Sequence, residues 1–184
     1  MRALAIFSAA ALLLAMSTGG CVSRAIKETV GVASGPKGVV AWIEPPVRPQ
    51  GYIPLSGYTN YTLQMNEGFG RTPSQVLSLL EPSFEHQLAE KRIPNYGSGP
   101  TVIVRGTIIH YESSTTVGQA LGPLEEVIAR VELVDSNSGK LIATANCIGR
   151  TQETVNGGPA KKAEGLAKAL VNMIDALYPP RPKE

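Results

Sequence analysis

The sequence of 184 residues has few of the side chains from which active sites and metal centres are built. It contains two histidines and two cysteines, no G-x-S-x-G motif and no Walker motif among its glycines. His86 and Glu90 are spaced as neighbours on a helix, but two ligands do not make a zinc site. Tyr111 alternates with His110 and Glu112, so a strand there would keep these three side chains from converging. We therefore predict no catalytic residue, no metal and no cofactor.

The sequence also lacks an excess of charge of one sign. It has 17 Lys and Arg against 15 Asp and Glu, which gives a net charge of +2. Nucleic-acid-binding domains usually carry a strong positive excess, so we expect no nucleic-acid partner. There is no internal repeat and no long low-complexity tract, and the length suits one domain plus a tether.

The one long apolar run is too short to cross a membrane. It extends from Ala3 to Met16, directly after the positive charge of Arg2, and small residues follow it up to Cys21. A membrane-spanning helix needs roughly 20 apolar residues. A shorter run after a basic start predicts a signal peptide over residues 1–20.

The cysteine after this run resembles the lipobox of bacterial lipoproteins. Gly20 and Cys21 fit the pattern, whereas Thr18 stands where lipoboxes usually carry Leu. The resemblance implies that Cys21 is lipidated and anchors the protein, since two or more acyl chains hold a protein stably. The residue after the cysteine, Val22, is not the Asp of inner-membrane retention, which implies the outer membrane, facing the periplasm. An ordinary secretory signal that leaves Cys21 as a free thiol is the alternative.

Residues 21–58 are rich in Gly and Pro, which predicts a tether between the membrane and the folded domain. One apolar island interrupts it at residues 38–43 and contains the single tryptophan, Trp42. A solvated linker has no use for such a patch. The island is therefore either an edge strand packed on the domain or a segment that binds a partner.

Residues 59–178 predict one α+β domain with the element order β-α-β-β-β-α, followed by a tail at residues 179–184. The apolar spacing after residue 72 favours a helix with Thr72 as its N-cap and Pro73 in the first turn. Pro82 should kink or split this helix. The β-branched run at residues 101–113 predicts the strongest strand. We expect a small mixed sheet with two helices on one face.

Two further strands, at residues 125–134 and 140–150, should form a hairpin around a five-residue loop. Such a loop pairs Leu133 with Leu141 and Ala129 with Ala145, with these side chains on one face. The side chains of the second strand on that face are small, which leaves room for a helix to pack there. An apolar stripe predicts such a helix from residue 159. Cys147 lies in this strand and should be a buried small residue; a reactive thiol and an intermolecular disulfide are the alternatives.

The lipobox, the Pro-rich tether, the VDSNSGKLI turn and the closing amphipathic helix together resemble several families of bacterial lipoprotein with domains of uncharacterised function. The resemblance implies an outer-membrane lipoprotein with a small α+β domain. It carries over no catalytic residue.

The starts of the two predicted helices form one candidate site. Glycine turns precede both, and the candidate residues there are Arg71, Thr72, Lys161 and Lys162. Helix N-termini present unpaired N–H groups and partial positive charge, so they favour anions. These residues are therefore candidates for binding a phosphate, a carboxylate or an acidic glycan.

The second face of the hairpin forms the other candidate site. It mixes apolar and polar side chains, namely Ile128, Val134, Ile142 and Ile148 with Arg130, Glu132, Thr144 and Asn146. Such a face is too apolar to be left wet and too charged for a deep core. We therefore take Trp42, Arg130 and Glu132 as a candidate surface for another envelope protein or for self-association. The leading hypothesis is a non-enzymatic binding or assembly factor; an enzyme or binding protein for a small anionic or glycan ligand is the alternative.

Overall fold

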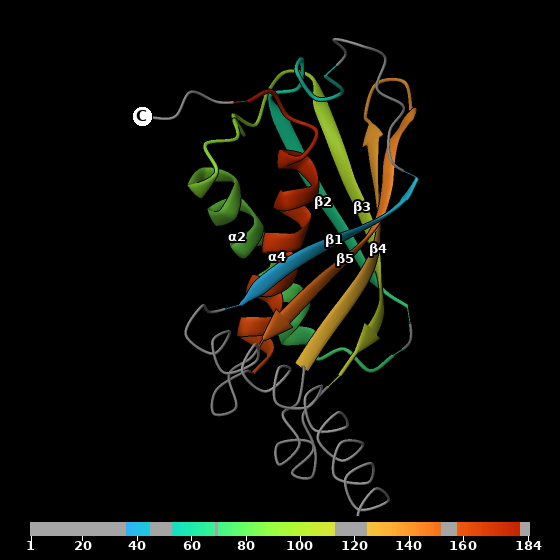
Figure 1. Cartoon of the computed structure of the whole chain (residues 1–184), viewed down its shortest axis with the longest axis vertical. Helices are drawn as coiled ribbons and strands as arrows, with labels where there is room; N and C mark the ends of the chain where they lie inside the picture. The colour runs from blue at the N-terminus through green and yellow to red at the C-terminus, as the bar shows by residue number, and fades with distance from the viewer. Residues whose placement is uncertain (1–35, 45–52, 69, 113–124, 152–157, 181–184) are drawn as a thin grey trace, which may run out of the picture.

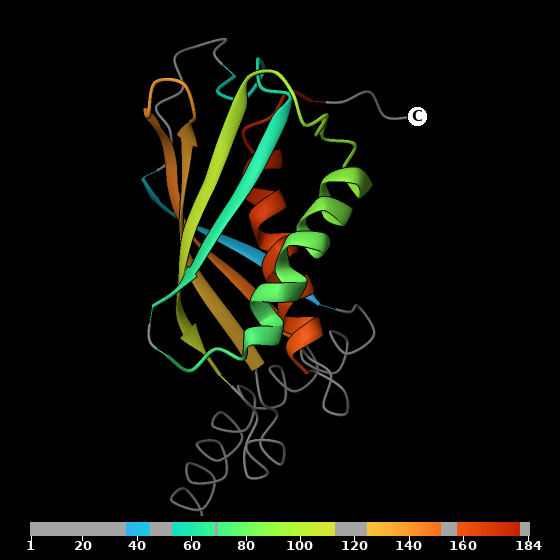
Figure 2. The same cartoon turned by 180° about the vertical axis from the view of Figure 1, so that it is seen from behind.

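The computed structural model describes residues 36–44, 53–68, 70–112, 125–151 and 158–180 (Figure 1). Within them, a five-stranded mixed sheet is covered on one face by two helices (Figures 1 and 2). The predicted α+β class is therefore confirmed. Cys21 and the predicted signal peptide lie outside the described residues. No helix in the described part of the chain is long and apolar enough to span a membrane.

The strands are β1 (Lys37–Glu44), β2 (Asn60–Glu67), β3 (Thr101–Tyr111), β4 (Glu125–Asp135) and β5 (Leu141–Thr151), and the helices are α2 (Ser74–Glu90) and α4 (Pro159–Asp175). The sheet has the order β1-β5-β4-β3-β2. Among the described strands, only β2 and β3 are parallel neighbours, and they stand on either side of α2 in the chain. The other neighbouring strands are antiparallel.

The apolar island around Trp42 forms the edge strand β1, which pairs with β5. The strand was one of the two interpretations open from the sequence, and it adds a fifth strand before the predicted β-α-β-β-β-α order. Residues 53–58 also pack on the domain, since Leu55 is fully buried and its N–H donates to the Leu177 carbonyl at 3.2 Å. The folded domain therefore takes in parts of the stretch from which we expected a tether.

Helix α2 differs from its prediction at its start and at its proline. Pro73, rather than Thr72, occupies the N-cap position, and no side chain of a described residue caps the helix. The helix also runs unbroken through Pro82, so of the two predicted outcomes, a kink or a split, the split does not occur. Pro82 lies on the exposed side, where water can replace the missing backbone donor.

The hairpin of β4 and β5 forms, but its register differs from the predicted one by two residues. Ala129 pairs with Cys147, where the loop length predicted Ala145. One residue of the difference comes from the turn, where pairing begins one residue later than predicted, and the other from a β-bulge next to Leu133. A shift of two keeps the other side chains on their predicted face. The exception is Leu141, which was predicted to face the helices and is 44% exposed.

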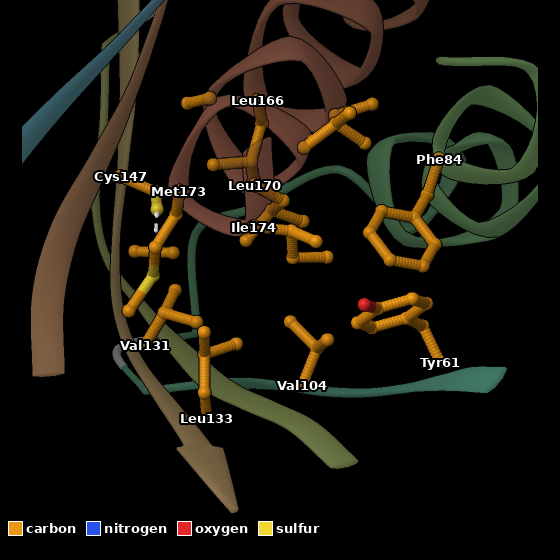
Figure 3. Packing of buried hydrophobic residues seen from close by; sticks show 14 of the residues in the cluster. Tyr61, Phe84, Val104, Val131, Leu133, Cys147, Leu166, Leu170, Met173 and Ile174 are labelled. Carbon is orange, nitrogen blue, oxygen red and sulfur yellow. Dashed lines mark hydrogen bonds between the residues drawn. The ribbon is translucent and has the colours of Figure 1, made fainter. Parts of the chain in front are cut away.

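Helix α4 packs directly on the backbone of the sheet, as the small residues of β5 predict. A Cβ atom added at Gly149 or Gly38 would overlap backbone atoms of α4, at Leu166 and Ala169 respectively. Side chains of α4 such as Leu170 fill the space over the central strands (Figure 3). We call the sheet face that the helices cover the inner face, and the opposite face the outer face.

Cys147 lies on the inner face and is fully buried. Its Sγ is 3.9 Å from Sδ of Met173 in α4 (Figure 3). Burial raises the pKa of the Cys147 thiol to about 12. The prediction of a buried small residue, rather than a reactive thiol, is confirmed, because a thiol with this pKa is almost entirely protonated near neutral pH.

Candidate binding surface

Among the described residues, no group of three or more His, Cys, Asp or Glu side chains could hold a metal ion. His86 Nε2 lies 3.4 Å from Glu90 Oε1, and both side chains are exposed on α2. His110 pairs with Ile128 in the register of β3 and β4, on the outer face. The two histidines therefore lie on different sides of the sheet.

Next to the start of α2, one half of the predicted anion site, lies a carboxylate of the chain itself. Glu67 Oε1 accepts a hydrogen bond from the backbone N–H of Thr72. The Thr72 hydroxyl is buried without a hydrogen-bond partner in the described residues, and Arg71 is exposed. Thr72 precedes the N-cap Pro73, so this carboxylate lies next to the start of α2 without capping its first turn.

The start of α4, the other half of that site, holds a buried lysine. Lys162 is 2% exposed, its Nζ donates to the backbone carbonyl of Glu112, and it lies 4.2 Å from the centroid of the Tyr111 ring. A hydrogen bond and a cation–π contact of this kind stabilise a buried ammonium group. The prediction that Lys162 binds an external anion is therefore wrong. Its partners are 50 residues away in the chain, and no local pattern reveals them.

Lys161, next to it, is also paired. Its Nζ lies 3.3 Å from Glu164 Oε2, and Lys168 Nζ lies 3.1 Å from Glu164 Oε1. Burial alone would raise the pKa of Glu164, but hydrogen bonds and charge from Lys168 and Lys161 outweigh it and lower that pKa. A groove of about 500 Å³ between α2 and α4 includes Lys161 but neither Arg71 nor Thr72. The four candidate residues therefore do not line one site.

The fold places only two of the three residues of the second candidate surface on the same face of the sheet. Arg130 and Glu132 lie on the outer face, because they alternate with the buried Val131 of β4. Trp42 pairs with Ala145 and packs against the core, so it lies on the inner face. The outer face is thus a candidate binding surface that excludes Trp42.

The strand registers divide the outer face into four cross-strand rows. Of these four, the two rows nearest the ends of the strands are mostly apolar, and the two rows between them are polar or charged. The first apolar row is Val39, Ile148, Ile128 and His110; the second is Leu141, Val134, Ile103 and Thr62. The central rows are Ala41, Asn146, Arg130, Thr107 and Asn66, then Glu44, Thr144, Glu132, Arg105 and Gln64. These four rows define the outer-face surface used below.

Some charged side chains on this surface have an ion-pair partner within the described residues, and others have none. Arg105 Nη2 lies 2.7 Å from Glu132 Oε2, in an exposed ion pair. Arg130 is exposed and has no hydrogen bond or ion pair to any described residue. The neighbouring Asn146 has a buried Oδ1 that lacks a partner in the same part of the chain. Val39 of the first apolar row is 41% exposed. The surface thus combines uncovered apolar area with unused polar groups.

No family model and no curated protein matches this chain. Among solved structures, it is similar to PelC from Paraburkholderia phytofirmans. The dodecamer of a PelC variant gives a TM-score of 0.44 at 16% identity, over 72% of this chain and 94% of that chain. A PelC dodecamer in another crystal form gives 0.43 at 14% identity, with the same coverage. Likeness at this level carries no argument about function.

Proposed function

We propose that this protein is a lipid-anchored envelope protein that binds another protein through the outer-face surface and acts as a non-enzymatic accessory or assembly factor. The observation that supports the proposal is the composition of this face. Val39 and Leu141 are exposed there, and Arg130 is left without a partner in the described residues. A domain that functions alone gains nothing from such a face, whereas an interface uses apolar area for affinity and charges for specificity.

The proposed location rests on the sequence. Lipidation of Cys21 would hold the domain at the outer membrane, facing the periplasm, and residues between Cys21 and β1 would set its reach. Cys21→Ser should then release the protein from membranes, or leave it as an unprocessed precursor, and abolish labelling with a fatty acid. Normal acylation of the variant would contradict the anchor, but would leave the outer-face proposal standing.

The binding proposal is tested by crosslinking in membranes and capture of the tagged full-length protein. Arg130→Glu reverses a charge in the middle of the outer-face surface, and should reduce capture of the partner. Lys140→Glu is the matched control, since Lys140 is exposed in the β4–β5 turn, outside the four rows. Both variants should keep the wild-type melting temperature. If both variants lost the partner to the same extent, or if neither variant lost it, the proposal would be contradicted.

A further inference from the structure

We infer that the partner at the outer face is a second copy of this chain, bound face to face around a two-fold axis. The inference rests on the proposed function, because it assigns an occupant to the same surface. Along the outer side of β4 the order is apolar, positive, negative, apolar, given by Ile128, Arg130, Glu132 and Val134. When two copies of this order are placed against each other in opposite directions, apolar residues face apolar residues and each positive residue faces a negative one.

A two-fold axis that lies in the interface, perpendicular to β4 at the level of Val131, reverses the order of the rows. It places Arg130 opposite Glu132 of the second copy, and the same contact repeats on the other side of the axis. Ile128 then lies opposite Val134 of the second copy. Closed two-fold dimers are the commonest oligomers and use one surface of each copy in this way.

The neighbouring strand repeats the match. Ile148 of β5 shares a row with Ile128, and Leu141 shares a row with Val134. The same axis therefore brings Ile148 opposite Leu141 of the second copy. Apolar rows meet apolar rows at both ends of the interface, and the charged rows meet in the middle.

The charge pairing also uses the groups that a single copy leaves unsatisfied. Arg130 has no partner in the described residues of its own copy, whereas Glu132 has Arg105 at 2.7 Å. In the dimer each Glu132 would lie between its own Arg105 and Arg130 of the second copy. Sheets that pack face to face lie about 10 Å apart, a gap that an Arg and a Glu side chain can span together.

The surface is of the right size for a dimer. Five strands about 4.8 Å apart and four rows about 6.6 Å apart give a projected area of roughly 600 Å². The accessible surface of such a rough face exceeds its projection. A standard interface removes roughly 800 Å² of accessible surface from each partner. Among the described residues both helices lie on the inner face (Figure 2). Of the apolar side chains on the outer face, Val39 and Leu141 are 41% and 44% exposed, whereas Val134 is 7% exposed.

The test uses two differently tagged full-length copies produced in the same cells, with capture of one copy from membranes and measurement of the other. Wild-type copies should capture each other. When both copies carry Arg130→Glu, carboxylates oppose each other; when both carry Glu132→Arg, guanidinium groups do. Each of these pairs should lose at least about tenfold in capture. Copies that carry Lys140→Glu should capture each other as wild type does.

The decisive pair combines one copy with Arg130→Glu and one with Glu132→Arg. In this pair both cross-copy contacts are of opposite charge again, so capture should return toward the wild-type level. A mixed pair as weak as the single variants would overturn the inferred arrangement. Wild-type copies that do not capture each other would overturn the inference of a second copy. The proposed function would survive that result if Arg130→Glu lowered capture of a different protein, and would fall with it if Arg130→Glu changed nothing.

Discussion

The two faces of the sheet differ in how far the rest of the chain buries their side chains. On the inner face, alternate residues of β3, β4 and β5 are almost fully buried, and α4 lies so close that two positions must be glycine. On the outer face, the positions between them mix isoleucines, arginines and a glutamate at partial or full exposure. One sheet thus has a face completed within the chain and a face left open in the described residues.

The comparison shows where stability and binding reside. Changes on the inner face should alter the free energy of unfolding, because they create overlap, cavities or unsatisfied polar groups. Changes on the outer face should leave folding nearly unchanged and alter association.

Gly149→Val should destabilise the domain most. The new side chain would overlap the backbone of α4 at Leu166, and neither β5 nor the helix can move without disturbing the core. Overpacking of this kind costs about 3 kcal/mol or more when backbone must shift. Urea unfolding of the variant measures the loss. Gly57→Ala is the control, because nothing lies within 4 Å of a Cβ added there. If both variants lost a similar amount of stability, the loss in Gly149→Val could not be attributed to overlap with α4.

Cys147→Ser should lower the free energy of unfolding by about 1–3 kcal/mol, since the hydroxyl would lack a partner beside Met173. A thiol reagent should label Cys147 in the wild-type protein only after denaturant is added. Rapid labelling of the folded protein would show that the inner face opens around β5.

The same thiol gives the folded protein a pH dependence. Its pKa lies near 9.0 when exposed and is raised to about 12 by burial. A raised folded-state pKa contributes stability below pH 9 that is lost as pH rises from about 9 to 12. Wild type should therefore lose more stability over this range than Cys147→Ala does. Parallel pH curves for the two proteins would contradict the burial of the thiol.

Lys162→Met should destabilise by about 1–2 kcal/mol, because the carbonyl of Glu112 loses its donor and the Tyr111 ring loses its cation. Lys161→Met is the matched comparison, since that lysine makes only a partly exposed ion pair with Glu164. Exposed pairs contribute about 0–1 kcal/mol. If both substitutions cost the same in urea unfolding, the buried role of Lys162 is refuted.

Arg130→Glu should have the smallest effect on folding, within about 0.5 kcal/mol, because Arg130 is exposed and has no partner in the described residues. Thermal unfolding of dissociated protein, in parallel with Lys140→Glu, measures it. A loss above 1.5 kcal/mol for Arg130→Glu alone would mean that the outer face contributes to the fold, contrary to the comparison.

The inner face could be predicted from the sequence, and the outer face only in part. The β-branched run at residues 101–113 predicted one strand, and the alternation in residues 125–134 predicted another together with its buried side chains, since both patterns are local properties. The register of β5 was missed because the turn is one residue longer than predicted and a bulge next to Leu133 leaves no clear local signal. Lys162 was misassigned because its partners come from the end of β3, and Trp42 was grouped with Arg130 because pairing of β1 with β5 spans about a hundred residues.

Binding at the outer face can be tested directly by the rate at which a thiol reagent labels Thr144→Cys in the full-length protein in membranes. Thr144 lies beside Glu132 in a central row of the outer-face surface, and the buried Cys147 does not compete for the reagent. We expect slow labelling that becomes fast when Arg130→Glu is added, with no change in the melting temperature of the dissociated protein. Equally fast labelling with and without Arg130→Glu would show that the outer face is open in the membrane-bound protein, and would contradict the claim that it is a binding surface.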